Sequence, residues 1–122
     1  MPWLLRGALE LIEANNYANG LVDLRRFEEA KSLLRKTMPI ARRALGETHR
    51  LMFKIRRMFA EALVRADGAT LDELREAATT LEDSGRTARR VFGGSHPLTT
   101  KIDGDLRQAR AALRARETPG DA

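Results

Sequence analysis

Residues 41–49 read ARRALGETH, and 47 residues later the chain repeats the pattern as ARRVFGGSH at residues 88–96. Further pairs keep this separation: Phe27 with Leu74, Ala30 with Ala77, Leu34 with Leu81, and Ile55 with Ile102. Earlier in the chain the separation is 42 residues, as between Tyr17 and Phe59. A period of this length is typical of repeat proteins, in which each unit buries its apolar face against the next one.

Apolar residues recur three and four positions apart along most of the chain, and this spacing predicts amphipathic helices rather than strands. We expect five helices, over about residues 3–24, 26–45, 48–66, 70–92 and 95–116. They form one all-α domain over residues 1–117, with repeat 1 at about 7–46, repeat 2 at about 47–93, a capping helix at about 95–116 and a disordered tail at 118–122.

Local signals mark the helix ends. Gly46 and Gly93 can adopt the positive φ that terminates a helix. Thr70 with Glu73 three residues later has the pattern of a capping box. We expect Ser95 to cap the last helix.

The same register predicts which aromatic and apolar side chains are buried. Tyr17, Phe27, Phe59 and Phe92 are predicted to face the core, as is Val91. This interpretation leaves Trp3 and Phe53 as the aromatic residues available for stacking on a ligand.

The composition excludes several classes of protein. The 122 residues include no cysteine, so disulfides and cysteine chemistry are excluded, and we expect a cytoplasmic location. No apolar stretch approaches the length of about 20 residues that spans a bilayer, so no membrane association is predicted. The net charge is +5, but the arginines are interleaved with acidic residues along the chain. Nucleic-acid binding by these dispersed arginines is therefore the second hypothesis rather than the first.

Four blocks carry a resemblance to a known family: residues 15–21 (NNYANGL), 26–34 (RFEEAKSLL), 44–49 (ALGETH) and 92–97 (FGGSHP). Together they resemble the tetratricopeptide repeat (TPR) of the 42-residue kinesin-light-chain type, over roughly residues 7–113. The resemblance implies a right-handed α-solenoid of stacked antiparallel helix pairs, here two hairpins and a capping helix. It departs from the family at Arg25, where the turn usually has glycine, and at Pro39 within the second predicted helix.

The resemblance also implies a concave peptide-binding groove along the first helix of each unit. Its lining positions are three before, one after and six before a small packing residue, which is Ala18 in the first unit and Ala60 in the second. The positions map to Asn15, Asn19 and Ile12; to Arg57, Glu61 and Lys54; and, in the capping helix, to Gly104, Gln108 and Lys101. Arg107 and Arg110 replace the packing residues of that last helix, as suits a solvated end.

These residues predict a non-enzymatic scaffold that binds a peptide segment or a neighbouring subunit. Asparagine amides can hold a peptide backbone, and Lys54, Arg57 and Lys101 would favour an acidic partner. Self-association through Trp3, Leu4 and Leu5 is a separate expectation. No pair of residues has the arrangement of a catalytic site, and we expect no cofactor.

His49 and His96 occupy equivalent positions and could suggest a metal site. A single histidine in each unit is a poor ligand set. We therefore interpret both residues as satisfying backbone groups where a helix begins, and we predict no metal.

Overall fold

The described part of the chain folds into five helices. The computed structural model describes residues 2–117, with the side chains of residue 7 and residues 9–117. This part of the chain is all-helical and contains no strand: α1 (Pro2–Asp23), α2 (Phe27–Leu45), α3 (Arg50–Arg65), α4 (Leu71–Phe92) and α5 (Pro97–Glu117). The prediction of five helices is confirmed, and each end lies within two residues of its predicted place. The predicted disordered tail, 118–122, lies outside the described residues.

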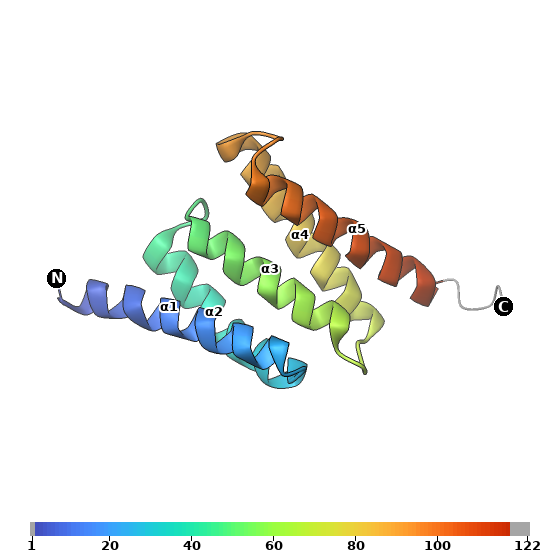
Figure 1. The fold of residues 1–122 in the computed structure, drawn as a ribbon, viewed down its shortest axis with the longest axis horizontal. Helices are drawn as coiled ribbons and strands as arrows, with labels where there is room; N and C mark the ends of the chain where they lie inside the picture. The colour runs from blue at the N-terminus through green and yellow to red at the C-terminus, as the bar shows by residue number, and fades with distance from the viewer. Residues whose placement is uncertain (1, 118–122) are drawn as a thin grey trace.

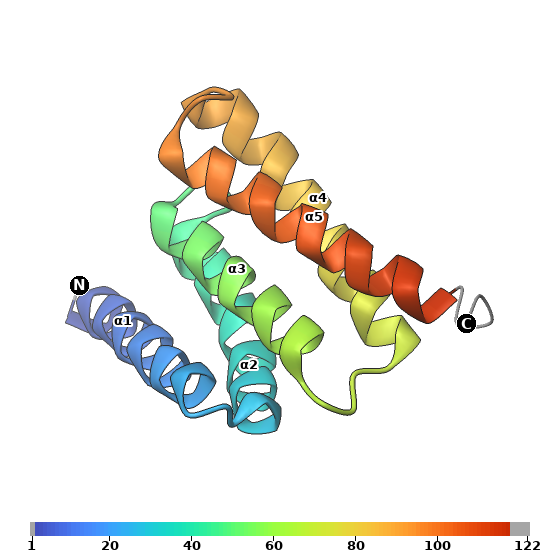
Figure 2. The same ribbon diagram turned by 45° about the vertical axis from the view of Figure 1, so that its right-hand side comes forward.

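The helices pack in chain order, each against the next, and α3 also packs against both α1 and α5. Figure 1 shows α1, α3 and α5 following one another across the molecule, with α2 and α4 behind them. The turned view in Figure 2 keeps the same order, with α3 between α1 and α5. The three helices predicted to begin a unit are therefore neighbours, as the groove hypothesis requires.

The core runs through the whole stack and is densest around α3. Met52, Phe53 and Ile55 of this helix have no exposed surface, and Phe59 is 1% exposed. The same apolar cluster extends from α1 to Ala109 in α5. A second, smaller cluster lies where the α1–α2 turn meets the end of α3. Burial of side chains this large stabilises a fold by about 1.5–3 kcal/mol each.

Several aromatic and apolar residues differ from their predicted environment. Tyr17 is 62% exposed and Val91 is 43% exposed, so both assignments to the core are wrong. Phe53 is not available for stacking on a ligand, because it is fully buried with its ring edge against Phe92 at 5.5 Å between centroids. The 42-residue separation pairs Phe53 with the buried Leu11, and this signal could have identified it as a core residue.

Most of the predicted helix signals are present. Thr70 and Glu73 form the capping box of α4, and Gly46 ends α2 with a φ of 83°. Ser95 was predicted to cap α5, but the backbone N–H of Leu98 donates instead to Nδ1 of His96, at 3.1 Å. The imidazole one residue nearer the helix reaches that N–H, so the serine prediction is wrong.

Arg25, in the turn between α1 and α2, adopts a backbone conformation that usually favours glycine. Its φ is 60°, in the left-handed region, and it is the one residue other than glycine with positive φ in the described chain. The guanidinium lies 5.5 Å from the centre of the Phe27 ring, an interaction that glycine could not make. The turn thus holds an arginine in a left-handed conformation beside an aromatic ring.

Ion pairs join α2 to α4. Lys31, with a side chain only 7% exposed, donates to Glu73 at 2.6 Å and contacts Glu28 at 2.7 Å. Arg35 binds Glu76 through two hydrogen bonds of 2.9 Å and lies over the Phe59 ring. These contacts fix α4 along α2, although the two helices are separated in the chain by α3.

The Lys31–Glu73 pair shifts both pKa values. Burial acts most strongly on Lys31 and opposes its charge, but the hydrogen bonds to Glu28 and Glu73 outweigh it and raise the pKa of Lys31. The hydrogen bond from Lys31, followed by the backbone N–H of Thr70, lowers the pKa of Glu73. Both groups are therefore charged at neutral pH.

A second ion-pair arrangement occurs in both units, with its acidic residue at a different position in each. In the first, Glu47 in the loop contacts Arg42 of α2 at 2.6 Å and also pairs with the buried Arg56 of α3. In the second, the loop position of Glu47 is Gly94 and the position of Arg56 is Asp103, which pairs with Arg89 at 2.8 Å. The contact between helices is kept while the acidic residue moves from loop to helix.

We predict that Glu73→Gln lowers the free energy of unfolding by about 1–2 kcal/mol, because it removes the charged partner of a buried ammonium. Glutamine keeps the hydrogen bond of the capping box, so the change isolates the pair with Lys31. The matched control is Glu28→Gln, which alters the other partner of Lys31 at a side chain that is 78% exposed. Urea unfolding of both variants measures the difference, and equal losses would contradict the assignment.

The same pair predicts a dependence on pH. The pKa of Glu73 is lower in the folded chain, so its contribution is complete above the ordinary carboxyl pKa of 4.5 and is lost as pH falls through the lowered value. Urea unfolding between pH 7 and pH 3 should show this loss in the natural protein and a smaller loss in Glu73→Gln. Lys31 remains protonated throughout this range.

Gly46 should be difficult to replace for a backbone reason alone. A Cβ at this position would meet no atom within 4 Å, but φ of 83° with ψ of 173° is a conformation that only glycine adopts readily. We expect Gly46→Ala to cost about 1–3 kcal/mol in thermal or urea unfolding. Gly104→Ala, inside α5, should instead stabilise by up to about 1 kcal/mol. Similar effects of the two changes would contradict this reasoning.

Candidate functional site

A hollow of about 280 Å³ lies between α1 and α3. Five of the nine predicted groove residues line it: Asn15, Asn19, Lys54, Arg57 and Glu61. The remaining lining residues are Asn16 and Met58. The structure thus brings together, from two helices, residues that the family pattern placed on one surface.

The α1 side of this hollow consists of amides. Asn19 is exposed, and Asn15 is partly buried on the same helix face. The Oδ1 atom of Asn15 is buried and has no hydrogen-bond partner in the described part of the protein. Rotation of this amide would therefore break no hydrogen bond made by its oxygen, and either its N–H₂ or its oxygen could be presented to a ligand.

The α3 side of the hollow is charged. Lys54 is exposed and has no ion-pair partner within residues 7–117. Arg57 donates from Nε to Oδ2 of Asp105 in α5 at 2.6 Å, and Glu61 accepts from Arg65 at 2.6 Å. Lys54 is therefore the uncompensated cation of this surface, whereas the charge of Arg57 is already balanced in part.

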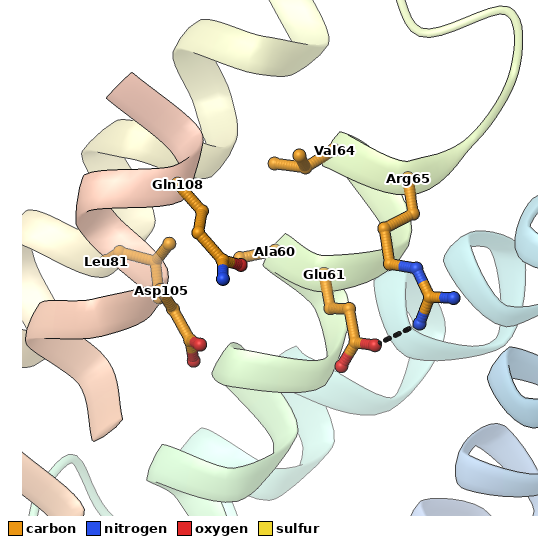
Figure 3. A pocket seen from close by; sticks show the side chains of 7 residues that line it. All are labelled: Ala60, Glu61, Val64, Arg65, Leu81, Asp105 and Gln108. Carbon is orange, nitrogen blue, oxygen red and sulfur yellow. Dashed lines mark hydrogen bonds and ion pairs between the residues drawn. The ribbon is translucent and has the colours of Figure 1, made fainter. Parts of the chain in front are cut away.

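A second hollow, of about 330 Å³, lies between α3 and α5. Figure 3 shows Gln108 and Asp105 entering it from α5, with Ala60, Glu61 and Val64 on the α3 side. Leu81 of α4 contributes to its lining. Because Glu61 lines both hollows, the two are adjacent along α3. The arrangement forms a polar surface across α1, α3 and α5, which we call the groove.

The other groove candidates lie outside both hollows. Lys101 is exposed on α5, and like Lys54 it has no ion-pair partner in the described chain. Ile12 is 45% exposed on α1, and Gly104 is partly buried on α5. Lys101 lies one turn before Asp105, so it stands near the groove without lining its hollows.

A further lining position was missed by sequence reasoning. It is two residues before the small packing residue, and it corresponds to Asn16, Met58 and Asp105. Asn16 and Met58 line the first hollow, and Asp105 lines the second. The repeat register itself contains this signal, because these three residues are related by the same separations of 42 and 47.

The two histidines have the structural role that we predicted. Nδ1 of His49 accepts from the backbone N–H of Leu51 at 3.0 Å, just as His96 does at the start of α5. The ring of His96 also stacks on Phe92 with 4.7 Å between centroids. Among the described residues no group of three or more His, Asp or Glu side chains could hold a metal ion.

Comparison with protein-family models, with curated proteins and with solved structures finds no match to this chain. The TPR resemblance therefore rests on the repeated residues themselves. None of the helices within residues 2–117 is long and apolar enough to cross a membrane. The expected self-association through Trp3, Leu4 and Leu5 concerns side chains outside the described ones.

Proposed function

We propose that this protein is a non-enzymatic scaffold of the TPR type, which binds an extended segment of another protein in the groove formed by α1, α3 and α5. In this proposal the hairpins α1–α2 and α3–α4 are two units of a right-handed α-solenoid, and α5 is its capping helix. The packing of α3 against both α1 and α5 supports the arrangement, because each unit-starting helix then neighbours the next.

The observation that carries the proposal is the convergence of Asn15, Asn19 and Lys54 on one hollow. Surface polar residues usually point into solvent from separate positions, whereas these line a common depression between two helices. An extended peptide has alternating N–H and C=O groups, and an asparagine amide offers one donor group and one acceptor to match them. The amide of Asn15 is suited to this role since its oxygen has no internal partner.

The charges favour an acidic segment. Lys54 and Lys101 are exposed and have no ion-pair partner in the described chain, so each would gain from a carboxylate. Arg57 contributes less, because Asp105 already accepts from its Nε. Its remaining guanidinium N–H groups could still donate to a ligand, since arginine has five donors.

We expect Lys54→Glu to weaken the binding of acidic peptides by about tenfold, because it replaces a charge-assisted hydrogen bond with repulsion. The probes are three pools of fluorescent random decapeptides, acidic, neutral and basic, titrated by fluorescence anisotropy. The matched control is Arg90→Glu, which makes the same change of net charge at an exposed residue of α4. The acidic pool should bind best to the natural protein and to this control.

A second variant should act in the opposite direction. Asp105→Asn removes the carboxylate that engages Arg57, so binding of the acidic pool should become stronger. Circular dichroism of both variants would confirm that the helices remain. Equal binding by the natural protein and Lys54→Glu, or binding that is indifferent to peptide charge, would contradict the groove proposal.

Nucleic-acid binding is the second candidate, and one observation favours it. A hollow of about 350 Å³ beside α4 and α5 is lined by Arg86, Arg89, Arg107 and Arg110. Acidic residues engage most of these side chains: Asp83 pairs with Arg86, Asp103 with Arg89, and Glu82 with Arg110. A gel-shift assay in increasing salt distinguishes this candidate, because phosphate contacts predict a steep loss of affinity.

A further inference from the structure

The face of the first hairpin that points away from α3 differs from its counterpart in the second hairpin. Tyr17 of α1 and Phe59 of α3 are equivalent residues, 42 positions apart. Phe59 is 1% exposed and lies beneath the guanidinium of Arg35, which belongs to the preceding hairpin. Tyr17 is 62% exposed, because no hairpin in the described chain covers it.

Other residues repeat this contrast. Leu24 is 68% exposed, whereas its equivalent Ala66 is 7% exposed at the contact between hairpins. Ile40 is 50% exposed, and its equivalent Thr87 lines a hollow that α2 also lines. A further hollow of about 250 Å³ lies beside Tyr17, lined by residues that include Leu33 and Lys36 of α2. We call this surface the open face; its apolar residues are Tyr17, Leu24, Leu33 and Ile40.

We infer that the open face is the interface for a second copy of this chain, which docks its own open face across a two-fold axis. Three of the six large apolar side chains that are most exposed in the described structure belong to this surface: Tyr17, Leu24 and Ile40. In the interior of the chain, the equivalent positions are covered by a helical hairpin. The same kind of element, supplied by another copy, would cover them here.

The charges of α2 favour a second copy of this chain as the partner of the open face. Glu29 and Lys36 lie seven residues apart, which is two turns of one helix, and both line the hollow beside Tyr17. Two copies of α2 that run antiparallel across a two-fold axis bring Glu29 of each copy to Lys36 of the other. Lys36 has no ion-pair partner in the described chain, and Glu29 is exposed where it accepts from Arg26. The open face is thus complementary to itself.

A head-to-tail arrangement fits less well. The internal contact places Arg35 of α2 over an aromatic ring and beside Glu76. On α4 the residue equivalent to Arg35 is Glu82, which would oppose Glu29, and it already pairs with Arg110 of α5. The far end of the molecule therefore offers an acidic residue where the open face would require a basic one, and α5 already packs against α4 there.

Charge exchange tests the inference directly. Sedimentation equilibrium of the natural protein, from low to high micromolar concentration, should give the mass of two chains as its upper limit. Glu29→Lys and Lys36→Glu should each weaken the dimer by about tenfold or more, since each creates two like-charge contacts per dimer. The double variant should regain the natural dissociation constant to within about threefold, because the two-fold axis restores both pairs.

A matched pair of apolar changes tests the surface independently of charge. Ile40→Ser should weaken the dimer, whereas Val91→Ser, at an exposed β-branched residue of α4 that is not part of the open face, should leave it unchanged. Circular dichroism checks that every variant is folded. A monomeric mass at the highest concentration, a mass that grows beyond two chains, or a charge exchange that fails to restore association would each overturn the inference. None of these results would bear on peptide binding at Lys54, which lies on the groove.

Discussion

The burial of α3 is the constraint on which the rest of the structure depends. This helix packs against α2 and α4 and contacts α1 and α5, and most of its large apolar side chains retain almost no exposed surface. An isolated hairpin could not cover such a helix, because each hairpin offers only one apolar face to a neighbour. Two hairpins and α5 together enclose it. The groove is a consequence, since α1 and α5 must lie on either side of α3.

Ion pairs then define how neighbouring helices align. Lys31 and Arg35 of α2 hold two glutamates of α4, and Arg57 of α3 holds Asp105 of α5. The helix contact is kept although its residues differ: Glu47 links Arg42 to Arg56 in one unit, and the equivalents of Arg42 and Arg56, which are Arg89 and Asp103, pair directly in the other. Partly buried pairs resist screening by salt better than exposed ones, so they can orient packed helices. The same pairs consume charges that would otherwise be available to a ligand, as Arg57 shows.

The sequence predicted which residues share the surface of the candidate site, but not which of them form ion pairs. The family pattern, applied to each repeat, placed Asn15, Asn19 and Lys54 on one side of successive helices, and the structure gathers them around one hollow. The sequence could not show that Asp105 accepts a hydrogen bond from Arg57, because the partner of a charged side chain depends on distances between helices far apart in the chain. The position of Asp105 was missed for a different reason. The residues expected to line the groove came from a family pattern, and that pattern did not include the position two residues before the packing residue.

The sequence alone determined the helices, their ends and the two repeated units, because apolar spacing, capping residues and glycine conformation act over a few residues. Tertiary structure decided what each repeated position does. Tyr17 and Phe59 are equivalent in the repeat, yet one is exposed and the other buried, since exposure depends on whether a neighbouring hairpin is present. Likewise, His96 rather than Ser95 caps α5, because the orientation of the entering loop decides which side chain reaches the first N–H groups.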